Sequence, residues 1–246
     1  MLITCAGRTD TGLRREGNED NFSVVPDLNL YFVADGMGGH LAGEVASRIA
    51  IDNLVDFFSK ERMKRIIGHP QEIRHQMIQA FIRTNEQVMA MAATNEDQHG
   101  MGCTLIAGLI DQTTIHVCHV GDVRCYVLTS KGLQQITTDH RWEVTPVIGR
   151  EAGDKGSRSF PGSNVLTRAI GYPFSEDPEY HSMGLETGSR ILFCSDGLWT
   201  MMDDQEIGRI LSSALTPEIA GETFISRANA AGGEDNITAV VVFLGG

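Results

Sequence analysis

Carboxylate side chains recur where apolar segments of this sequence begin or end, usually beside a glycine or an asparagine. They are Asp20, Asp35, Asp122, Asp196 and Asp235, with Glu19 directly before the first of them. If these segments are strands, their ends can meet at one sheet edge, where like charges repel and raise one another's pKa. A divalent cation relieves this repulsion, and an all-oxygen ligand set favours Mg²⁺ or Mn²⁺ over zinc. The pattern therefore predicts a metal-binding edge.

Each of these aspartates also has a simpler interpretation. Asp-Gly after a strand is a common turn, so any one of them taken alone could be a turn residue or a helix cap. Asp204, which directly precedes Gln205-Glu206-Ile207, is interpreted as a helix cap. For the others, repetition on well-formed apolar segments favours metal binding.

The glycine-rich stretch Asp35-Gly36-Met37-Gly38-Gly39-His40 leads into a predicted helix. A turn of this kind at a helix N-terminus favours anions. It fails as a dinucleotide-binding fingerprint because the third glycine would fall at Leu41, and the chain contains no P-loop motif. Ser195 lacks the preceding glycine of a hydrolase nucleophile elbow.

Composition limits the classes of partner and compartment. The chain has 246 residues, 41% of them hydrophobic, and a formal net charge of −12. Nucleic acid and anionic membranes are poor partners for such a chain, because they are negatively charged themselves. No apolar run approaches the roughly 18 residues of a membrane helix, and the first residues do not resemble a secretory signal. Five widely spaced cysteines, mostly within apolar runs, favour buried thiols in a reducing cytoplasm.

Hydrophobic periodicity indicates the elements that must position these residues. Helical spacing predicts helices over 41–60, 71–93, 204–214 and 217–231. Short apolar runs predict strands over 3–6, 22–25, 30–34, 104–110, 114–120, 123–129, 190–194 and 237–243. We interpret the consecutive runs between 104 and 129 as a strand meander. Paired helices and grouped strands indicate an α+β fold.

Residues 139–164 fit neither pattern and are rich in glycine, proline, serine and charge. A long irregular segment in a compact domain is usually a functional or mobile loop. No repeat or linker divides the chain, so the sequence predicts a single domain over 1–246.

The motifs occur together in the order of a known family. They are Thr9-Asp10-x-Gly12-x-x-Arg15-x-x-Asn18-Glu19-Asp20, Val33-Ala34-Asp35-Gly36-Met37-Gly38-Gly39-His40, Met101-Gly102-x-Thr104-Leu105, Val120-Gly121-Asp122-x-Arg124, Thr138-Asp139-His140, Thr167-Arg168-Ala169-Ile170-Gly171, Ser195-Asp196-Gly197-Leu198-Trp199 and Asp235-Asn236-Ile237-Thr238. Through them the chain resembles the metal-dependent protein phosphatases of the 2C type, in their compact bacterial form. The ordered set spans nearly the whole chain, which makes the resemblance specific.

The resemblance implies a four-layer αββα sandwich, in which two antiparallel sheets are flanked by helix pairs. It also implies hydrolysis of phosphoserine and phosphothreonine in proteins, with two or three Mn²⁺ or Mg²⁺ ions at one sheet edge. Asp35 matches the carboxylate that bridges two metals, and Gly36 matches the carbonyl ligand of one of them. Asp196 and Asp235 match ligands of the other metal, and Asp122, with Asp196, matches a third, weaker metal position.

Four further residues acquire roles from the resemblance. Glu19 and Asp20 match residues that hold metal-bound waters, Arg15 matches the phosphate-binding arginine, and His40 matches the proposed general acid. Two metals can activate a shared water near neutral pH. A guanidinium can hold two phosphate oxygens at once, and an imidazole can protonate the leaving alkoxide.

Three features stand apart from the family pattern. Cys103 and Arg141 occupy positions where the family usually has threonine and serine, and Arg141 begins the atypical part of the 139–164 flap segment. His116 and His119 are three apart on a predicted strand and so face opposite sides, which favours core or surface roles over a shared metal.

Two other functions remain open at this level. The chain could be a two-metal hydrolase of small phosphoesters or nucleotides, or a signalling domain that binds phosphoproteins without turnover. The leading interpretation is a cytoplasmic, monomeric phosphatase in signalling. Its partners would be a phosphorylated protein substrate and a cognate Ser/Thr kinase, with no nucleic-acid or membrane partner.

Overall fold

The computed structural model describes residues 2–38, 41–94, 96–142 and 165–245. The helices are α1 (Leu41–Phe57), α2 (Lys60–Ile66), α3 (Pro70–Thr94), α4 (Asp196–Trp199), α5 (Asp204–Ser213) and α6 (Pro217–Ala231). The strands are β1 (Leu2–Asp10), β2 (Asn21–Val25), β3 (Leu30–Met37), β4 (Gly102–Asp111), β5 (Thr114–Val120), β6 (Arg124–Thr129), β7 (Gly132–Gln135), β8 (Glu179–Gly184), β9 (Arg190–Cys194) and β10 (Ile237–Gly245). Among the described helices, none combines the length and apolar character needed to cross a membrane.

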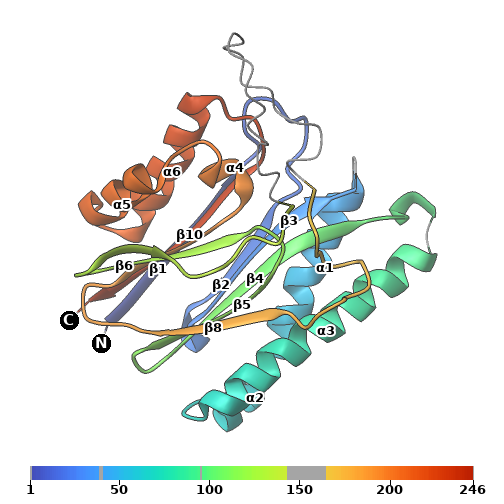
Figure 1. Ribbon diagram of the computed structural model, residues 1–246, viewed down its shortest axis with the longest axis horizontal. Coiled ribbons are helices and arrows are strands. Elements are labelled where there is room, and N and C mark those ends of the chain that lie inside the picture. Colours follow the sequence, from blue (N-terminus) through green and yellow to red (C-terminus); the bar gives the residue numbers. More distant parts are fainter. Residues whose placement is uncertain (1, 39–40, 95, 143–164, 246) are drawn as a thin grey trace, which may run out of the picture.

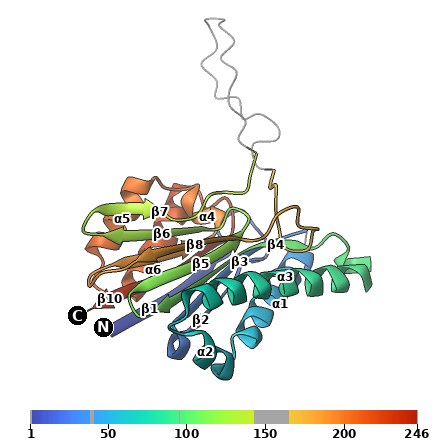
Figure 2. The same ribbon diagram turned by 60° about the horizontal axis from the view of Figure 1, so that its bottom comes forward.

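The strands form two five-stranded antiparallel sheets, with the orders β1-β10-β9-β6-β7 and β2-β3-β4-β5-β8. Helices α4, α5 and α6 cover the first sheet, and α1, α2 and α3 cover the second (Figures 1 and 2). The arrangement is the predicted four-layer αββα sandwich.

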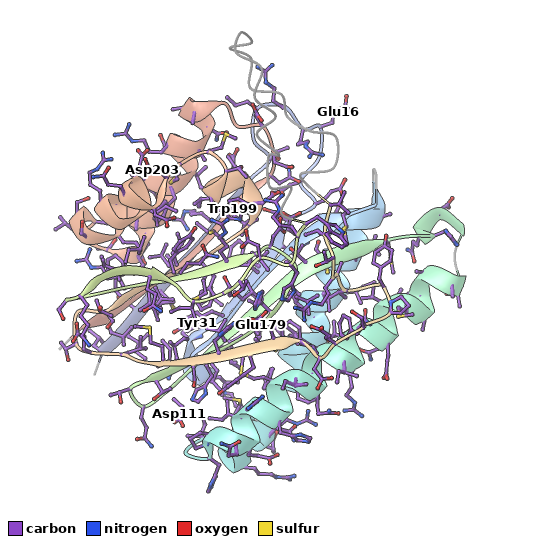
Figure 3. The ribbon with its side chains drawn as sticks, in the orientation of Figure 1. Glu16, Tyr31, Asp111, Glu179, Trp199 and Asp203 are labelled. Carbon is purple, nitrogen blue, oxygen red and sulfur yellow. The ribbon has the colours of Figure 1, made fainter. Side chains whose placement is uncertain are left out.

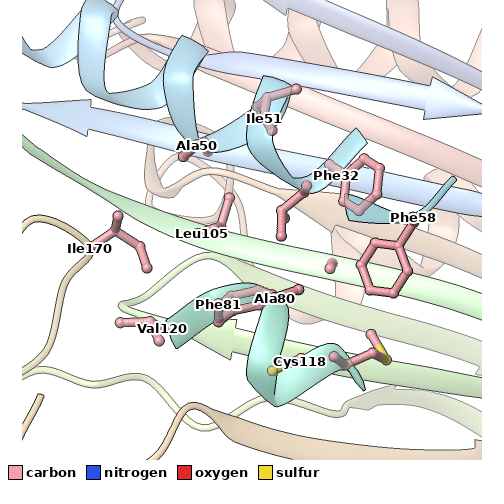
Figure 4. Close-up of a cluster of buried hydrophobic side chains, with 14 of the residues drawn as sticks. Phe32, Ala50, Ile51, Phe58, Ala80, Phe81, Leu105, Cys118, Val120 and Ile170 are labelled. Carbon is pink, nitrogen blue, oxygen red and sulfur yellow. The ribbon is translucent and has the colours of Figure 1, made fainter. Parts of the chain in front are cut away.

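Apolar side chains fill the three interfaces between these layers. Between the second sheet and its helices, Phe32 and Leu105 of the sheet face Ala50 of α1 and Phe81 of α3 (Figure 4). These side chains are at most 1% exposed. Burial of a large apolar side chain contributes roughly 1.5–3 kcal/mol. These interfaces therefore supply a stable base for the polar groups at the sheet edge.

Local signals define the helix ends near the predicted positions. Helix α5 is capped by Asp203, whose side chain accepts a hydrogen bond of 2.8 Å from the Glu206 amide. The cap predicted at Asp204 is therefore wrong by one residue, because Asp204 already has helical geometry. Helix α6 ends at Gly232, whose φ of 143° suits glycine.

The predicted meander is wrong in its third strand. Strands β4 and β5 form a hairpin, but β6 pairs with β7 and β9 in the other sheet. Gly121 has a φ of 101°, a left-handed conformation that favours glycine, in the connection between the sheets. What resembles a hairpin turn in the sequence is therefore a crossover, and it carries Asp122.

Strand β8 was not predicted because its sequence, Glu179–Gly184, lacks an apolar run. Among the strands that the structure describes, β8 is at the edge of the second sheet, beside β5. Edge strands tolerate polar side chains, which weakens the pattern that identifies them. Figure 3 places Glu179 on this strand and Trp199 on the segment of α4.

Candidate metal centre

Most of the predicted metal ligands line one cavity of about 470 Å³. Its lining comprises Arg15, Glu19, Asp35, Gly36, Met37, Gly38, Thr104, Asp122, Arg141, Leu166, Asp196, Asp235 and Asn236. Asp20 follows the lining residue Glu19 in the chain, and the charges of Asp196 and Asp235 act on it. We call the group Asp20, Asp35, Asp122, Asp196 and Asp235 the carboxylate edge.

Close backbone contacts position the first part of this edge. Asp35 and Gly36 end β3 opposite Thr104 and Cys103 of β4. The Gly36 amide donates a hydrogen bond of 3.2 Å to the Glu19 carbonyl, and a Cβ at Gly36 would collide with the Gly43 carbonyl. The same Cβ would lie 2.6 Å from the Glu19 carbonyl oxygen, so helix α1 and the segment that carries Glu19 can both approach β3 only because position 36 is glycine.

Asp20 is nearly inaccessible, with 4% exposure. Its Oδ2 accepts hydrogen bonds of 2.7 Å from Ser195 Oγ and 2.6 Å from Thr238 Oγ1. Its Oδ1 is buried and has no hydrogen-bond partner among the described residues. Burial raises the pKa of Asp20 to about 8; the charges of Asp196 and Asp235 add to this, and the two hydroxyl groups oppose it.

Three other carboxylates show the same electrostatic conflict. Burial raises the pKa of Asp35 well above its usual range, and the charge of Asp20 is the next cause. Burial and the charge of Asp235 raise the pKa of Asp196. Burial raises the pKa of Asp122 to about 6, with the charge of Asp196 as the next cause. The ionised edge is thus costly unless positive charge is supplied.

Arg15 lies at the same edge, as predicted, and contacts a predicted metal ligand. Its Nη2 is 2.6 Å from Asp235 Oδ2, and both side chains are partly exposed. The other oxygen, Asp235 Oδ1, accepts a hydrogen bond of 2.8 Å from the Asn236 amide.

Asn236 holds the loop that carries Arg15 and Glu19. Its Nδ2 donates bonds of 2.9 Å to the carbonyls of Thr11 and Gly17, and its Oδ1 accepts a bond of 2.8 Å from the Glu19 amide. No function was predicted for Asn236. Its place beside Asp235 was the only local signal.

His40, the predicted general acid, lies outside the described residues. The rest of the predicted set is brought together: the carboxylate edge, Glu19, Gly36 and Arg15 occupy one region. Arg141, which in the sequence is only a departure from the family pattern, also lines this cavity.

A second group of buried titratable side chains lies nearby. His119 of β5, His140 and Glu179 of β8 have potential ligand atoms within 4.8 Å of one another. We call these three residues the histidine cluster. His119 Nε2 lies 2.9 Å from the Thr138 carbonyl oxygen, and because a carbonyl can only accept, the histidine nitrogen donates. His116, on the other face of β5, contacts the Tyr180 hydroxyl instead, in agreement with the predicted opposite orientations.

The histidine cluster satisfies much of its own hydrogen-bonding capacity. His140 Nδ1 accepts a bond of 3.1 Å from the Gly121 amide, so its Nε2 carries the proton and donates to Glu179 Oε2 at 2.9 Å. Both nitrogens of His140 are therefore engaged. Burial lowers the pKa of His119 to about 4 and also lowers that of His140. The two histidines are therefore suited to remain neutral and structural beside the Glu179 carboxylate.

The carboxylate edge has the opposite character and fits hard divalent cations. Its donors are oxygens only, Asp20 presents a buried oxygen without a hydrogen-bond partner, and burial disfavours the negative charges. Mg²⁺ and Mn²⁺ prefer donors of this type.

Comparison with known proteins places this geometry in context. A family model described as Protein phosphatase 2C matches residues 8–237. Serine/threonine phosphatase stp of Listeria monocytogenes is 35% identical over 238 residues, which cover 96% of this chain and 93% of that protein.

Two solved structures extend the similarity to three dimensions. The serine/threonine phosphatase PstP/Ppp of Mycobacterium tuberculosis has a TM-score of 0.83 and 30% identity, with 100% of both chains covered. The catalytic domain of PstP in complex with two manganese ions has a TM-score of 0.81 and 31% identity, with 99% of both chains covered.

Proposed function

The chain belongs to the protein phosphatase 2C family and is a metal-dependent protein serine/threonine phosphatase; we propose that the carboxylate edge is its catalytic centre. The observation that carries this assignment is the convergence of four aspartates whose pKa values are all raised, Asp20, Asp35, Asp122 and Asp196. A fold that tolerates this repulsion needs bound cations to relieve it.

Asp35 would hold two divalent ions jointly, with the Gly36 carbonyl on one of them and Asp196 and Asp235 on the other. These groups come from three strand ends, β3, β9 and β10, so the sheets fix their relative positions. Bound Mn²⁺ or Mg²⁺ would supply Lewis acidity toward the phosphate ester and acidify a water.

Asp20, Glu19 and Asp122 would support the centre from positions beside the two proposed metals. Ser195 and Thr238 orient the Asp20 carboxylate and leave its Oδ1 as an acceptor for a water. Glu19 and Asp122 both line the cavity, and Asp122 would serve a third, weaker metal position.

Arg15 would bind the phosphoryl group of the substrate. Its guanidinium reaches the cavity beside Asp235, and it can donate two parallel hydrogen bonds to phosphate oxygens. His40 would protonate the leaving serine or threonine oxygen, an assignment that rests on its place in the motif around Asp35.

Phosphate release tests this proposal directly. A phosphothreonine peptide and a nucleotide would be incubated with the full chain in the presence of Mn²⁺ or of a chelator. We expect Mn²⁺-dependent release from the peptide, and Asp196→Asn should abolish it while circular dichroism shows a retained fold. Asp52→Asn, at an exposed position of α1, is the matched control and should leave the rate unchanged.

Two outcomes would contradict the proposal. Full activity of the Asp196→Asn variant would remove the carboxylate edge from the reaction. Turnover of the nucleotide alone would instead favour a hydrolase of small phosphoesters.

The proposed setting of the enzyme follows from its substrate. A phosphoprotein substrate must be made by a protein kinase, so we place an opposing Ser/Thr kinase in the same cytoplasmic signalling system. We further propose that the chain acts as a monomer and as one domain over 1–246, with 139–164 as its flap. Four buried cysteines, Cys103, Cys118, Cys125 and Cys194, support a reducing compartment.

A further inference from the structure

Arg141 brings a second cationic side chain to the catalytic cavity. Of the described residues that line the cavity, Arg15 and Arg141 carry a guanidinium. Arg15 contacts Asp235, whereas Arg141 Nη2 lies 3.4 Å from Asp122 Oδ2. The Arg141 and Asp122 side chains are only 16% and 5% exposed. Their charges are therefore less screened by solvent than those of a surface ion pair.

The backbone around Arg141 is held in place. Arg141 forms an isolated antiparallel bridge with Leu166. On either side, the Trp142 amide donates a bond of 3.0 Å to the Val165 carbonyl, and the Thr167 amide donates one of 2.8 Å to the His140 carbonyl. These contacts pair 140–142 with 165–167. The Arg141 backbone, from which the side chain extends, therefore has a defined position beside the cavity.

Trp199 of α4 contacts both Arg141 and Asp122, in addition to the ion pair between these two residues. Its Nε1 donates a bond of 3.0 Å to the Asp122 carbonyl, and its ring centroid lies 5.0 Å from Arg141 Cζ. A guanidinium within about 6 Å of an indole ring is attracted by the ring electrons. The indole therefore holds the crossover at Asp122. Its ring centroid also lies 3.5 Å from Arg124 Cζ, so the ring attracts the guanidinium groups of both Arg124 and Arg141. Figure 3 shows Trp199 at this end of the molecule.

The charge of Arg141 acts on the carboxylate edge. Arg141 Nη2 lies 3.4 Å from Asp122 Oδ2, and Asp122, Asp196 and Arg141 line the same cavity. A divalent ion that used Asp122 would have to displace this guanidinium or lie close to it, and like charges at such range repel.

We propose that Arg141 is a resident cation at Asp122, so that the protein itself neutralises this carboxylate and an additional divalent ion binds there only weakly. The inference rests on the proposed function, because it takes Asp122 as part of the metal centre. It concerns only the divalent ion that would use Asp122 and leaves the sites around Asp35 as proposed. Arg141 would thus set how many metals the centre holds at a given concentration.

Calorimetric titration of the metal-free full chain with Mn²⁺ tests the proposal without relying on activity. In the Arg141→Ser variant, we expect affinity at the weakest site to increase about tenfold or more, because one repulsive charge is removed. Arg141→Lys keeps the charge and should remain close to the native chain. Arg168→Ser is the matched control, since Arg168 is 18% exposed and contacts Glu176 and Glu179 instead of the cavity. It should change nothing at this site.

A second variant identifies the carboxylate. Combining Arg141→Ser with Asp122→Asn should abolish the gain in affinity. Circular dichroism of each variant checks that the fold is retained. An Arg141→Ser titration identical to that of the native chain would overturn the proposal. So would a gain that persists with Asp122→Asn, or a lysine variant that behaves like the serine variant.

The stronger sites separate this result from the proposed function. Native binding of two Mn²⁺ ions that Asp35→Asn abolishes, with no effect of Arg141→Ser, would overturn only the role of Arg141. Absence of Mn²⁺ binding in the native chain would overturn the proposed function, and the inference about Arg141 with it.

Discussion

The carboxylate edge and the histidine cluster both bury titratable side chains, and they lie close together in the chain: His119 is three residues before Asp122. In the histidine cluster, His140 accepts a hydrogen bond at Nδ1 from the Gly121 amide and donates one from Nε2 to Glu179. In the carboxylate edge, desolvation and neighbouring carboxylates raise the pKa of four acids, and Asp20 retains an oxygen that has no hydrogen-bond partner among the described residues. His119 Nδ1 is likewise buried without a hydrogen-bond partner among the described residues, but a neutral imidazole nitrogen needs no added charge, and Arg168 lies 3.8 Å from the Glu179 carboxylate. The carboxylate edge differs because it depends on positive charge from outside the chain.

This difference distinguishes polar side chains that are buried for stability from those that are buried for catalysis. Buried polar groups that satisfy one another stabilise the fold they belong to. Buried like charges destabilise it, and the surrounding sheets must hold them in place. The contrast therefore predicts opposite responses of the two regions to substitution, to pH and to metal.

Asp35→Asn should produce the largest effect. Losing the proposed shared ligand of both metals should lower the rate of phosphopeptide hydrolysis by about a thousandfold, since bound metals supply several kcal/mol of stabilisation. The same variant should melt at a higher temperature than the native chain in the presence of a chelator, because one repelling charge is gone. Phosphate-release assays and thermal melts measure the two effects.

Asp52→Asn is the control, because this exposed aspartate of α1 should affect neither rate nor melting. If Asp35→Asn lowered the melting temperature of the metal-free chain, the proposed repulsion at the carboxylate edge would be wrong.

The pH dependence of stability should reverse between the two regions. Asp20 has a pKa of about 8 in the fold against 3.8 as its ordinary value, so the metal-free folded chain binds more protons between these limits. Its contribution to stability therefore falls as pH rises through that window. His119 has a pKa of about 4 in the fold against 6.5, so its contribution falls as pH drops below 6.5.

Thermal melts with chelator and with Mn²⁺ at several pH values test this reversal. We expect the chelated protein to melt at a lower temperature at pH about 8 than at about 6, and Mn²⁺ to raise melting most at the higher pH. A chelated protein that gains stability from pH about 6 to 8 would contradict the assignment of Asp20.

His140→Ala should have a smaller effect, confined to stability. The substitution leaves the Gly121 amide and Glu179 without their shared partner, which costs about 1–3 kcal/mol. Urea unfolding measures the change. His75→Ala, at an exposed position of α3, should stay within about 0.5 kcal/mol of the native chain. Equal effects of the two substitutions would show that the histidine cluster contributes no stability.

Much of the fold and the candidate site could be predicted because the signals are local. Apolar periodicity identified α1, α3, α5, α6 and the central strands, with boundaries within a few residues. The repeated aspartates at strand ends identified the carboxylate edge, and the ordered motifs identified the family. In contrast, β8 was missed because its polar residues show no period, and the cap of α5 was displaced because Asp203 and Asp204 are both acidic.

The sequence by itself determined which groups could bind cations, because donor type and position at a strand end depend only on residues near in the chain. Only the tertiary structure decided which groups meet. It placed β6 in the other sheet, paired Arg15 with Asp235 and Arg141 with Asp122, and brought Glu179 of the unpredicted β8 beside His140. The physical reason is that the alternation of apolar and polar side chains is a local property of the sequence, whereas strand pairing and ion pairing join residues far apart in the chain.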